Sequence, residues 1–587
     1  MSALGKSAIL PLLAGLLLWV GLASPAWALH TVSAPGMASD TVGATESAGP
    51  PAPAAVWGCP MCEAVRRPEP GTCPRCGMQL VPMGSGATSG HLPLMPGLPP
   101  WLFFTVALLV LVISFVLLQV RAPAGRPEPA FRFDLLRSRR LRALLRQPRF
   151  PLVVQLPVVL LFALVVVAGL LGNPAPDRNI APILTWTIWW ASLVLVVVFG
   201  GKLWCTVCPW MALANWCGRF LPRLERPWPR ALRNIWPATL LFVLLTWLEL
   251  GYGVTGKPWL TAVLGLGMLV LAAGTVVVFE RKAFCRYACL VGRVSGLYAT
   301  FAATELRAAD RETCRRCATK DCYRGNERGA PCPTHQFLGT MRANTYCTLC
   351  FECVKSCPET NVAWSVRPFG ADLLESIRPR KDEAFLAVIM LALSAFHGLT
   401  MTPAWERIVL AFDAASGLGW LAAFTVAMAV MLILPVAVYY AICVLMTWCA
   451  GDRRHDAGML FVRFSYALLP IALFYHLAHN LQHILFEGTK LLRVSSDPFG
   501  WGWDLFHTAR MPVGAVLPVE VGWAMQVTLI LVGHVYALAI VHRTARALYP
   551  DPRVATASQL PMLTAMLLFS FQSLWLLSQP MLMRTKL

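Results

Sequence analysis

The chain has 587 residues, of which 57% are hydrophobic and only 14% are charged, which is the composition of a membrane protein. A net charge of +20 would suggest nucleic-acid binding in a soluble protein, but most of the basic residues lie in loops between apolar runs. Membrane topology explains that pattern better, so we expect no nucleic-acid partner. The sequence has no Walker A loop and no Rossmann fingerprint, so ATP-driven transport and direct NAD(P)H oxidation find no support.

The first residues are predicted to be an export signal. An apolar run at 9–22 follows a basic residue, and a small-residue cleavage site ends at Ala28, so we predict a signal peptide over residues 1–28. The alternative is an uncleaved anchor, although the run is short for a membrane span. Both interpretations place residues 29–97 outside the cytoplasm.

The exported segment holds a cysteine-rich module, residues 57–83, between linkers rich in Pro, Ala and Gly. Its two Cys-x-x-Cys pairs can place four sulfurs around one metal ion: Cys59, Cys62, Cys73 and Cys76. So short a module cannot bury an adequate core, so a bound metal would stabilise its fold directly. Two disulfides are the alternative in an oxidising compartment.

This module resembles the small heavy-metal-binding domain attached to copper-transport ATPases and efflux adaptors. In that family a histidine commonly follows the first Cys-Pro-Met, whereas this chain has Cys62 there. The cysteine makes the site closer to a zinc ribbon or a small rubredoxin-like iron site, while Met61, Met78 and Met83 add soft sulfur that suits Cu(I). Zinc, copper and iron all remain candidates.

Ten apolar runs follow, each close to the ~20 residues that a membrane-spanning helix needs. They lie at 98–120, 151–172, 182–203, 235–252, 259–279, 384–403, 419–448, 463–486, 521–541 and 558–580. Alternate loops are rich in Arg or Lys: 121–149, 204–234, 280–383, 449–462 and 542–557. The positive-inside rule places these loops in the cytoplasm, so we predict a multi-pass protein of a bacterial-type inner membrane, with the lipid bilayer as its first partner.

The most specific motif is Cys347-x2-Cys350-x2-Cys353-x3-Cys357, followed by proline. This spacing binds three thiolates to one [4Fe–4S] cluster and sends the fourth cysteine to a neighbouring cluster. Cysteines that only fill space in a buried core would not be expected to repeat at this regular spacing. The motif therefore predicts a protein that transfers electrons, and a cytoplasmic position would protect its thiolates from disulfide formation.

A partner motif with a wider middle gap lies just upstream, at Cys314, Cys317, Cys322 and Cys332. In a two-cluster ferredoxin each fourth cysteine crosses over to the other cluster. We therefore predict two [4Fe–4S] clusters. One is assigned to Cys314, Cys317, Cys322 and Cys357. The other is assigned to Cys347, Cys350, Cys353 and Cys332. The alternative is a zinc site made by the first four cysteines alone.

Two further cysteine pairs follow the third and fifth apolar runs: Cys205 with Cys208, and Cys285 with Cys289. The predicted topology opens both helix ends on the same side, so four thiolates could converge near the cluster motifs. They would hold a further cluster or metal, act as redox-active thiols, or serve only as small residues for helix packing.

These features together resemble the membrane polyferredoxins over roughly residues 150–365. That family includes the nitrous-oxide-reductase regulatory protein, the quinol-dehydrogenase subunit of periplasmic nitrate reductase and the cbb3-oxidase assembly protein. The resemblance implies 4Fe-4S electron transfer between the membrane or cytoplasm and the maturation or supply of a metalloenzyme, with a redox protein as partner. This chain departs from the family's repeated CxxxCP, because its first pair is CxxCP and Leu290 follows Cys289.

Histidines inside the last apolar runs are the second unusual signal. His476, His479, Asn480 and His483 fall near one face of a single helix, and ionisable groups at membrane depth are functional candidates. His476 and His534 have similar predicted depths on neighbouring antiparallel helices, so they could ligate a b-type haem. A quinone site, a copper or proton path, and helix–helix hydrogen bonding are the alternatives.

We therefore expect a polytopic α-helical membrane protein with about ten spans. Its expected parts are the signal peptide (1–28), the exported linker and module (29–97), a first membrane domain (98–303), a dicluster ferredoxin-like domain (304–366) and a second membrane domain (367–587). The expected function is iron–sulfur electron transfer between a cytoplasmic or quinol donor and a membrane or exported acceptor. It remains open whether the chain is itself an enzyme such as a quinol dehydrogenase. The alternatives are copper or heavy-metal homeostasis and redox sensing.

Overall fold

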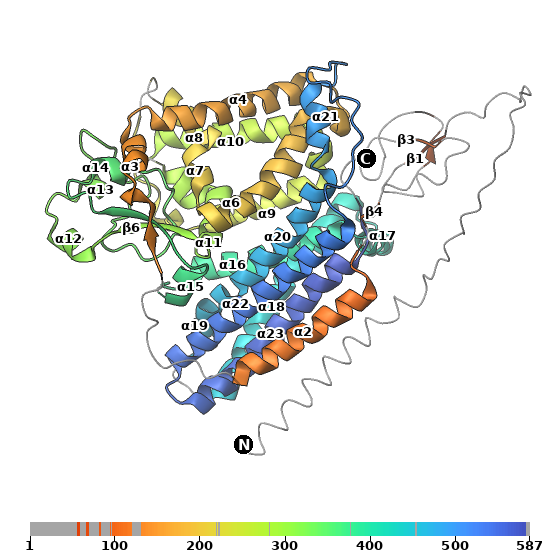
Figure 1. Cartoon of the computed structure of the whole chain (residues 1–587). Coiled ribbons are helices and arrows are strands. Elements are labelled where there is room, and N and C mark those ends of the chain that lie inside the picture. The colour runs from red at the N-terminus through yellow and green to blue at the C-terminus, as the bar shows by residue number, and fades with distance from the viewer. Residues whose placement is uncertain are drawn as a thin grey trace, which may run out of the picture.

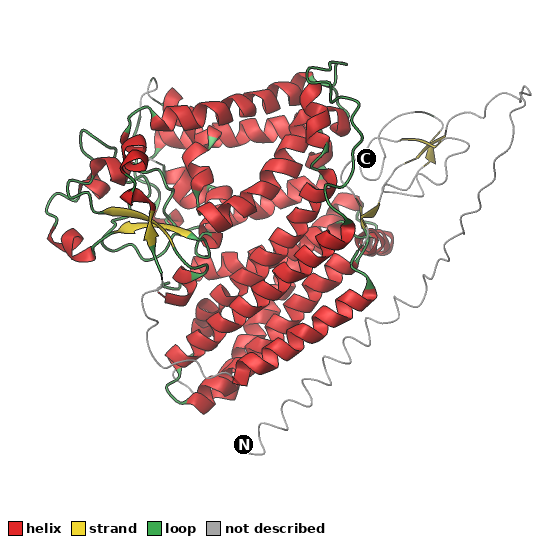
Figure 2. Cartoon of the chain, in the orientation of Figure 1, coloured by secondary structure: helices red, strands yellow, loops and turns green. Residues whose placement is uncertain are grey.

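The chain is described by a computed structural model that is mostly helical (Figure 2). It describes residues 97–119, 131–218, 220, 223–280, 282–375, 377–451 and 455–582, with short pieces at 56–58, 66–67, 69, 81–83 and 94–95. The predicted signal peptide lies outside these residues.

Nine helical segments of the described part are long and apolar enough to cross a membrane. They are α2 (Pro100–Gln119), α4 (Phe150–Leu171), α5–η4–α6 (Ile180–Gly200), α10 (Pro258–Val278), α16 (Lys381–Thr400), α18 (Trp420–Ala450), α19–η8–α20 (Ala457–Glu487), α22 (Val519–Leu548) and α23 (Pro552–Ser578). The fourth predicted run, residues 235–252, forms the shorter helix α9 (Trp236–Gly251). The prediction of a multi-pass helical membrane protein is confirmed.

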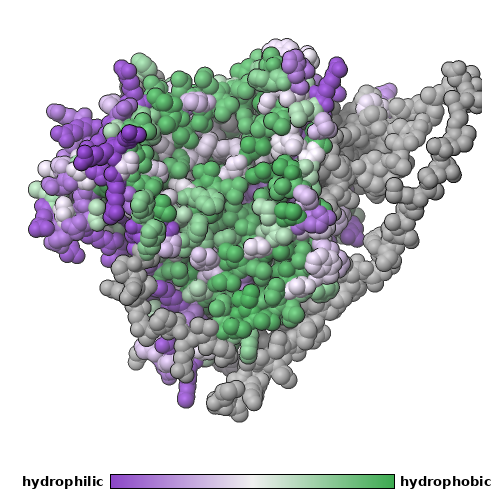
Figure 3. Space-filling model, viewed as in Figure 1, coloured by the Kyte–Doolittle hydropathy of each residue, from purple (hydrophilic) through white to green (hydrophobic). Residues whose placement is uncertain are grey.

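The outer surface of these helices is apolar, as expected for contact with lipid. Leu160 on α4, Val270 on α10 and Ile433 on α18 are 61%, 69% and 67% exposed. Figure 3 shows a broad hydrophobic surface over the helices and hydrophilic residues over the cysteine-rich segment that projects from them. Exposed apolar area of this extent would be unfavourable in water, so it belongs in a bilayer.

The helices form two groups, which Figure 1 shows one above the other. The upper group contains α4, α6 (Trp190–Gly200), α8 (Pro209–Cys217), α9 and α10. The lower group contains α16, α18, α20 (Leu468–Glu487), α22, α23 and α2. Packing of α6 on α20 and of α9 on α16 joins the groups. The first span, α2, packs against the last two, α22 and α23, rather than against its neighbours in sequence.

The cysteine-rich segment, residues 304–366 and hereafter the insert, lies between α10 and α16 at one end of the helices (Figure 1). An antiparallel sheet of order β5-β7-β6 frames it, from β5 (Phe133–Asp134), β7 (Val362–Val366) and β6 (Thr304–Ala308). Its short helices are α12 (Arg311–Arg316), α13 (Asp321–Arg324) and α14 (Glu352–Ser356). Helix α3 (Arg139–Arg146), from the loop between the first two spans, packs against α14, so the insert recruits residues outside the predicted boundaries.

The helix ends define two faces. The insert face carries the insert and the basic loop that contains α3. The opposite face carries the short helix α21 (Lys490–Ser496) and the pairing of β4 (Leu94–Met95) with β8 (Met581–Leu582). It also carries α17 (Pro403–Ser416), which the sequence analysis treated as a loop; its mixed polar and apolar pattern suits a helix lying at the membrane surface. The alternation of faces agrees with the predicted topology, while the compartment of each face remains a prediction.

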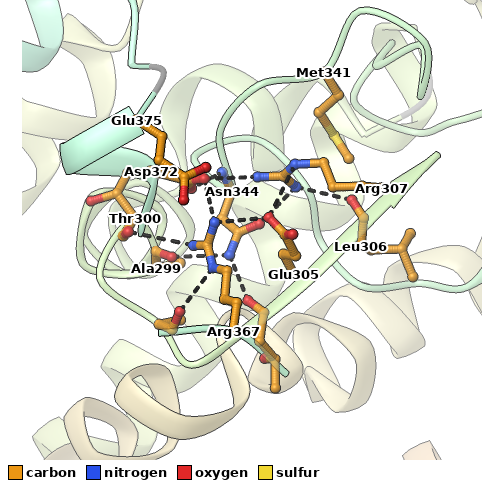
Figure 4. Close-up of polar contacts among 12 residues, drawn as sticks. Ala299, Thr300, Glu305, Leu306, Arg307, Met341, Asn344, Arg367, Asp372 and Glu375 are labelled. Atoms are coloured by element: carbon orange, nitrogen blue, oxygen red, sulfur yellow. Dashed lines mark hydrogen bonds and ion pairs between the residues drawn. The ribbon is translucent and has the colours of Figure 1, made fainter. Parts of the chain in front are cut away.

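Buried ion pairs attach the insert to the membrane helices (Figure 4). Arg367, 3% exposed, binds the carboxylates of Glu305 and Asp372, and its Nε donates to the Ala302 carbonyl at 3.1 Å. The Asn344 amide donates to the backbone oxygens of Ala299 and Thr304 at 3.0 and 2.8 Å. Every charged group here has a partner, so the network fixes the insert's position without an uncompensated buried charge.

Candidate cysteine and histidine sites

The first cysteine-lined cavity lies in the insert. Its lining includes Cys314 from α12, Cys322 from α13, Cys317 and Cys357. Asn361 donates from its side-chain Nδ2 to Cys314 Sγ at 3.3 Å and from its backbone N to Cys357 Sγ at 3.4 Å. N–H groups that point at cysteine sulfurs are one of the means by which proteins tune iron–sulfur clusters.

The second cavity lies beside the first. Cys332, Cys347, Cys350 and Cys353 line it, and the Gln336 backbone N donates to Cys332 Sγ at 3.3 Å. Burial raises the pKa of the Cys347 thiol to about 12. Iron would therefore have to displace protons from these thiols as it binds.

The two cavities contain the cysteines of the two predicted quartets. Cys357 joins the first three cysteines of the upstream motif, and Cys332 lines the other cavity. Within the described residues, no three His, Cys, Asp or Glu side chains are grouped closely enough for one metal ion.

A third cavity lies where the membrane helices meet the insert. Its lining includes Cys205 and Cys208 from one chain segment and Cys285 and Cys289 from another. Cys208 directly precedes α8, and Cys289 directly precedes α11 (Leu290–Tyr298), where its Sγ accepts the Gly292 N–H at 3.3 Å. Two helix N-termini with their partial positive charges therefore adjoin this cavity.

The two cysteine pairs of the third cavity differ in length by one residue, and the difference has a local explanation. The longer pair begins in a π-helical turn, η7 (Phe284–Ala288), after which the Cys289 backbone N donates to the Phe284 oxygen at 2.7 Å. This wider turn absorbs the additional residue. The first residue of α8 is Pro209, whereas the first residue of α11 is Leu290. Proline is favourable at the first position of a helix, so α11 lacks that stabilisation. Cys289 still directly precedes its helix, as Cys208 does.

Basic side chains surround the third cavity. Lys202 and Lys282 line it, and Lys202 is 1% exposed. Burial lowers the pKa of the Lys202 amine to about 8, and the nearby Arg293 guanidinium acts in the same direction. Arg293, also 1% exposed, lies over the Tyr346 ring at 4.5 Å, and none of its three side-chain nitrogens has a hydrogen-bond partner among the described residues. This part of the protein therefore has an excess of buried positive charge.

The three cavities are adjacent to one another. Cys322 and Leu338 line both the first and the second cavity, and Thr348 lines both the second and the third. Lys282 interacts electrostatically with Cys285 of the third cavity and with Cys350 of the second. The cavities therefore form a continuous series from the outer part of the insert to the membrane helices.

A fourth cavity, hereafter the histidine chamber, lies between the two helix groups. It is lined by Trp190, Phe242, Thr246, Glu249, Leu393, Ser394, His397, Tyr475, His476, His479 and Asn480. The structure thus brings together three of the four polar residues predicted on one helix face. Tyr298, the last residue of α11, has its hydroxyl 3.4 Å from His476 Nδ1. Helix α11 therefore runs from the third cavity to the chamber, a rise of about 13 Å at roughly 1.5 Å per residue.

A row of titratable side chains continues from the chamber towards the opposite face. The His397 and His479 rings are 5.2 Å apart between centroids, and those of His479 and His483 are 5.0 Å apart. His483 Nδ1 lies 3.0 Å from Glu487 Oε2, and Glu487 Oε1 lies 3.3 Å from Lys490 Nζ on α21. The row therefore extends ionisable side chains from the chamber to α21.

Tryptophans link the third cavity to the chamber by a second route. Trp204 lines the third cavity, and its ring lies 5.1 Å from that of Trp189 between centroids. Trp189 lies 5.8 Å from Trp190, which lines the chamber. Trp189 ends the π-helical segment η4 (Ile183–Trp189) inside the third span. Both π-helical segments of the described chain therefore contribute to this region.

The structure does not support the predicted haem ligation by His476 and His534. His534 Nε2 and Nδ1 lie 2.7 and 2.8 Å from the hydroxyls of Ser114 and Ser570, so neither nitrogen is available for iron. Its neighbours come from α2 and α23, whereas His476 lines the chamber. His534 instead connects three helices by hydrogen bonds, the packing role considered as an alternative.

Sequence reasoning overlooked three residues that matter to these sites. Glu249 was detectable, because it is the only acidic residue in an apolar run. Lys202 lies three residues before Cys205 and was a weaker signal. Arg293 was also detectable, because it lies four residues after Cys289, one helical turn along α11.

The N-terminal cysteine-rich module, residues 57–83, is described only in part. Its strands β1 (Val56–Gly58), β2 (Arg66–Arg67) and β3 (Val81–Met83) form an antiparallel sheet of order β2-β1-β3. Its four predicted ligands lie outside the described residues: Cys59, Cys62, Cys73 and Cys76.

Comparison with known proteins gives one match. Residues 56–83 match the family model of the heavy metal binding domain. No curated protein and no solved structure matches the chain. The matched segment agrees with the resemblance found from the cysteine pairs, and it covers only the exported module. The chain is therefore a multi-helix membrane protein that carries a heavy-metal-binding domain near its N-terminus.

Proposed function

We propose that this protein is a membrane-bound iron–sulfur electron-transfer protein of the polyferredoxin type. Two [4Fe–4S] clusters would bind in the insert, one to Cys314, Cys317, Cys322 and Cys357. The other would bind to Cys347, Cys350, Cys353 and Cys332. The observation that supports this most directly is that each quartet, assigned by spacing, lines its own cavity. The clusters supply one-electron chemistry, and the protein positions them and adjusts their potentials.

The arrangement favours electron movement between the insert and the membrane interior. The shared lining residue Cys322 keeps the two proposed cluster sites adjacent, and the third cavity continues the series towards the helices. The tryptophans and α11 then lead to the histidine chamber. A cytoplasmic redox protein would dock on the basic, exposed side of the insert, where Arg315 is 77% exposed.

The histidine chamber is the proposed site of the membrane-side carrier. A quinol oxidised there would give up two electrons and two protons, and the chamber offers both a nearby electron route and titratable groups. His476 and Tyr298 lie on the side of the chamber reached by α11, and Glu249 and His397 lie 3.9 Å apart on neighbouring helices. Polar groups of this kind inside an apolar cavity suit a quinone head group.

Metal analysis tests this proposal. The full-length protein, purified anaerobically in detergent, should contain at least eight irons and eight sulfides per chain, and dithionite should produce the EPR signals of reduced [4Fe–4S] clusters. Replacing Cys353 by Ser should lower the iron content by about four. Cys217→Ser is the matched control, because Cys217 is exposed and lines none of the three cavities. Fewer than about four irons in the wild-type protein would contradict the proposal.

A second candidate function is copper or heavy-metal homeostasis, in which metal captured by the exported module passes inward along the histidines. Two observations favour it: the match of residues 56–83 to a heavy metal binding domain, and the buried row of His397, His479 and His483. The position of Lys490 beside Glu487 counts against it, because a buried ammonium at the end of the row would repel an entering cation.

The double change Cys59→Ser and Cys62→Ser separates the two functions. For an electron-transfer protein it should leave cluster content and reduction of the clusters unchanged. For a metal-homeostasis protein it should abolish metal delivery and sensitise cells to copper excess or shortage. Cellular copper tolerance and cluster reduction, measured on the same variant, decide between them.

A further inference from the structure

We infer that the third cavity binds a third [4Fe–4S] cluster, held by Cys205, Cys208, Cys285 and Cys289. Its charge would be compensated by two buried cations, Lys202 and Arg293. This inference rests on the proposed electron-transfer function and assigns the site through which electrons pass between the insert and the membrane helices. Each passage moves one electron between this cluster and a reduced or oxidised neighbour, an insert cluster or a quinol in the chamber, and no bond forms or breaks.

The geometry supplies four sulfurs from two chain segments. Cys205 and Cys208 come from the turn between the third span and α8, and Cys285 and Cys289 come from the turn between α10 and α11. The structure brings these segments, about 80 residues apart in sequence, around one cavity at the junction of the membrane helices and the insert.

The charges identify an anionic occupant. The Arg293 guanidinium is buried, lacks hydrogen-bond partners among the described residues, and lies close enough to Cys285 and Cys289 to interact with both electrostatically. Lys202 has one long bond, 3.4 Å to the Thr345 oxygen, and lines the same cavity. Buried cations without a counter-charge are strongly unfavourable. A cluster with four thiolates carries a net negative charge that increases on reduction, which would make both cations favourable.

The other interpretations of these cysteines explain less. Small residues for helix packing would not require two buried cations or two helix N-termini at the same cavity. A redox-active dithiol would use one or both of the cysteine pairs. Its disulfide form carries no charge, so Lys202 and Arg293 would have no permanent anionic partner. A single zinc ion would need four sulfurs grouped closely around one point, and the described residues contain no such group.

Iron content tests the assignment directly. The full-length protein should hold about twelve irons per chain, and the double change Cys285→Ser and Cys289→Ser should lower this to about eight. Cys217→Ser should leave it at twelve. Eight irons in both the wild-type protein and the double variant would overturn the third cluster while leaving the two insert clusters intact. Loss of the insert clusters from the wild-type protein would instead be a failure of the proposed function.

A second experiment tests the charge argument. It leaves the cysteines unchanged, so it is informative even if the cysteine variant fails to fold. In Arg293→Met the cluster loses a cation that favours its reduced form, so the midpoint potential of one of three EPR-detected clusters should become more negative. The other two should keep theirs. Arg140→Met, on the exposed surface of α3, should shift none of them. If Arg293→Met leaves all potentials unchanged, or moves all three equally, the assignment of Arg293 to the third cluster is wrong.

Discussion

Arg367 is the residue on which the position of the insert depends most. It binds Glu305 at 2.9 Å, contacts Asp372, and reaches the backbone at the end of α11, so one side chain connects β6, β7 and the membrane helices. All three charged groups are at most 4% exposed. Removing a single partner therefore leaves a buried charge without compensation, which costs far more than a surface ion pair contributes.

Arg367→Met should lower the free energy of unfolding of the insert by ~3–5 kcal/mol, because Glu305 and Asp372 would lose their shared cation. The measurement is thermal or denaturant unfolding of the purified protein, followed by the visible absorbance of its clusters. Arg140→Met on the exposed surface of α3 is the control and should change stability by less than ~0.5 kcal/mol. A similar loss in both variants would contradict the role assigned to the network.

The same network predicts a loss of stability in acid. Burial alone would raise the pKa of Glu305, but Arg307, Arg367 and Arg132 outweigh burial and hold that pKa below its usual range. Because the folded pKa is lowered, the stabilisation is fully present above the unfolded value of about 4.3 and disappears as pH falls through the folded value. Unfolding at a series of pH values below about 5 should show this decline. Glu305→Gln should make the decline shallower, and an unchanged slope would argue against Glu305 as its source.

At the scale of elements, α11 is the connection on which the proposed electron route depends. It starts at Cys289 of the third cavity and ends at Tyr298 beside the histidine chamber. Its middle is pressed against the loop that carries Thr348, which lines two cavities. Gly296 makes this approach possible, since a Cβ there would lie 2.4 Å from the Thr345 backbone oxygen.

Gly296→Ala should therefore force α11 and the insert apart. We expect a loss of ~1–3 kcal/mol in unfolding free energy, typical of overpacking, together with a lower cluster content. Gly267→Ala in α10 is a matched control, because a Cβ there meets nothing within 4 Å and alanine favours helix over glycine by roughly 0.5–1 kcal/mol. Thermal unfolding and iron analysis should be compared between the Gly296→Ala and Gly267→Ala variants. Equal stability of both would show that the close approach is not required.

Sequence spacing grouped the insert cysteines into two sets, and each set lines a cavity because its members lie on short segments close in sequence; the binding of clusters there stays a prediction. It was less informative for the histidines. Counting residues along a helix gives the depth of His476 and His534 but not the neighbour that each side chain faces. His534 turns towards Ser114 and Ser570, and His476 turns towards the chamber.

For the whole molecule, the important property is the separation of the insert from β4, which follows the heavy-metal-binding domain in sequence. The insert lies at one end of the helices, and β4 lies at the other end. The basic loops share the insert face, which the positive-inside rule assigns to the cytoplasm. An electron entering the insert would therefore travel towards the compartment that holds the heavy-metal-binding domain.

Reporter fusions test this orientation. Alkaline phosphatase, which is active only after export, should be active when fused after Leu582 and inactive when fused after Gln147, in the basic loop of the insert face. A fluorescent protein that folds only in the cytoplasm should give the reverse pattern at the same two positions. Phosphatase activity at Gln147 would mean that the insert faces outward and would contradict the predicted topology.

The contact between the two ends of the membrane region has a consequence for biosynthesis. β4 pairs with β8, the Leu98 N–H donates to the Leu577 oxygen at 3.0 Å, and α2 packs on α22 and α23. The helix α2 therefore gains these neighbours only after the last two spans of the chain have been synthesised. During translation α2 must wait in lipid or beside an insertion factor while the insert emerges. Closure of this contact would be the final step of assembly, and a chain truncated before α23 should retain an unpaired first helix that quality-control proteases can recognise.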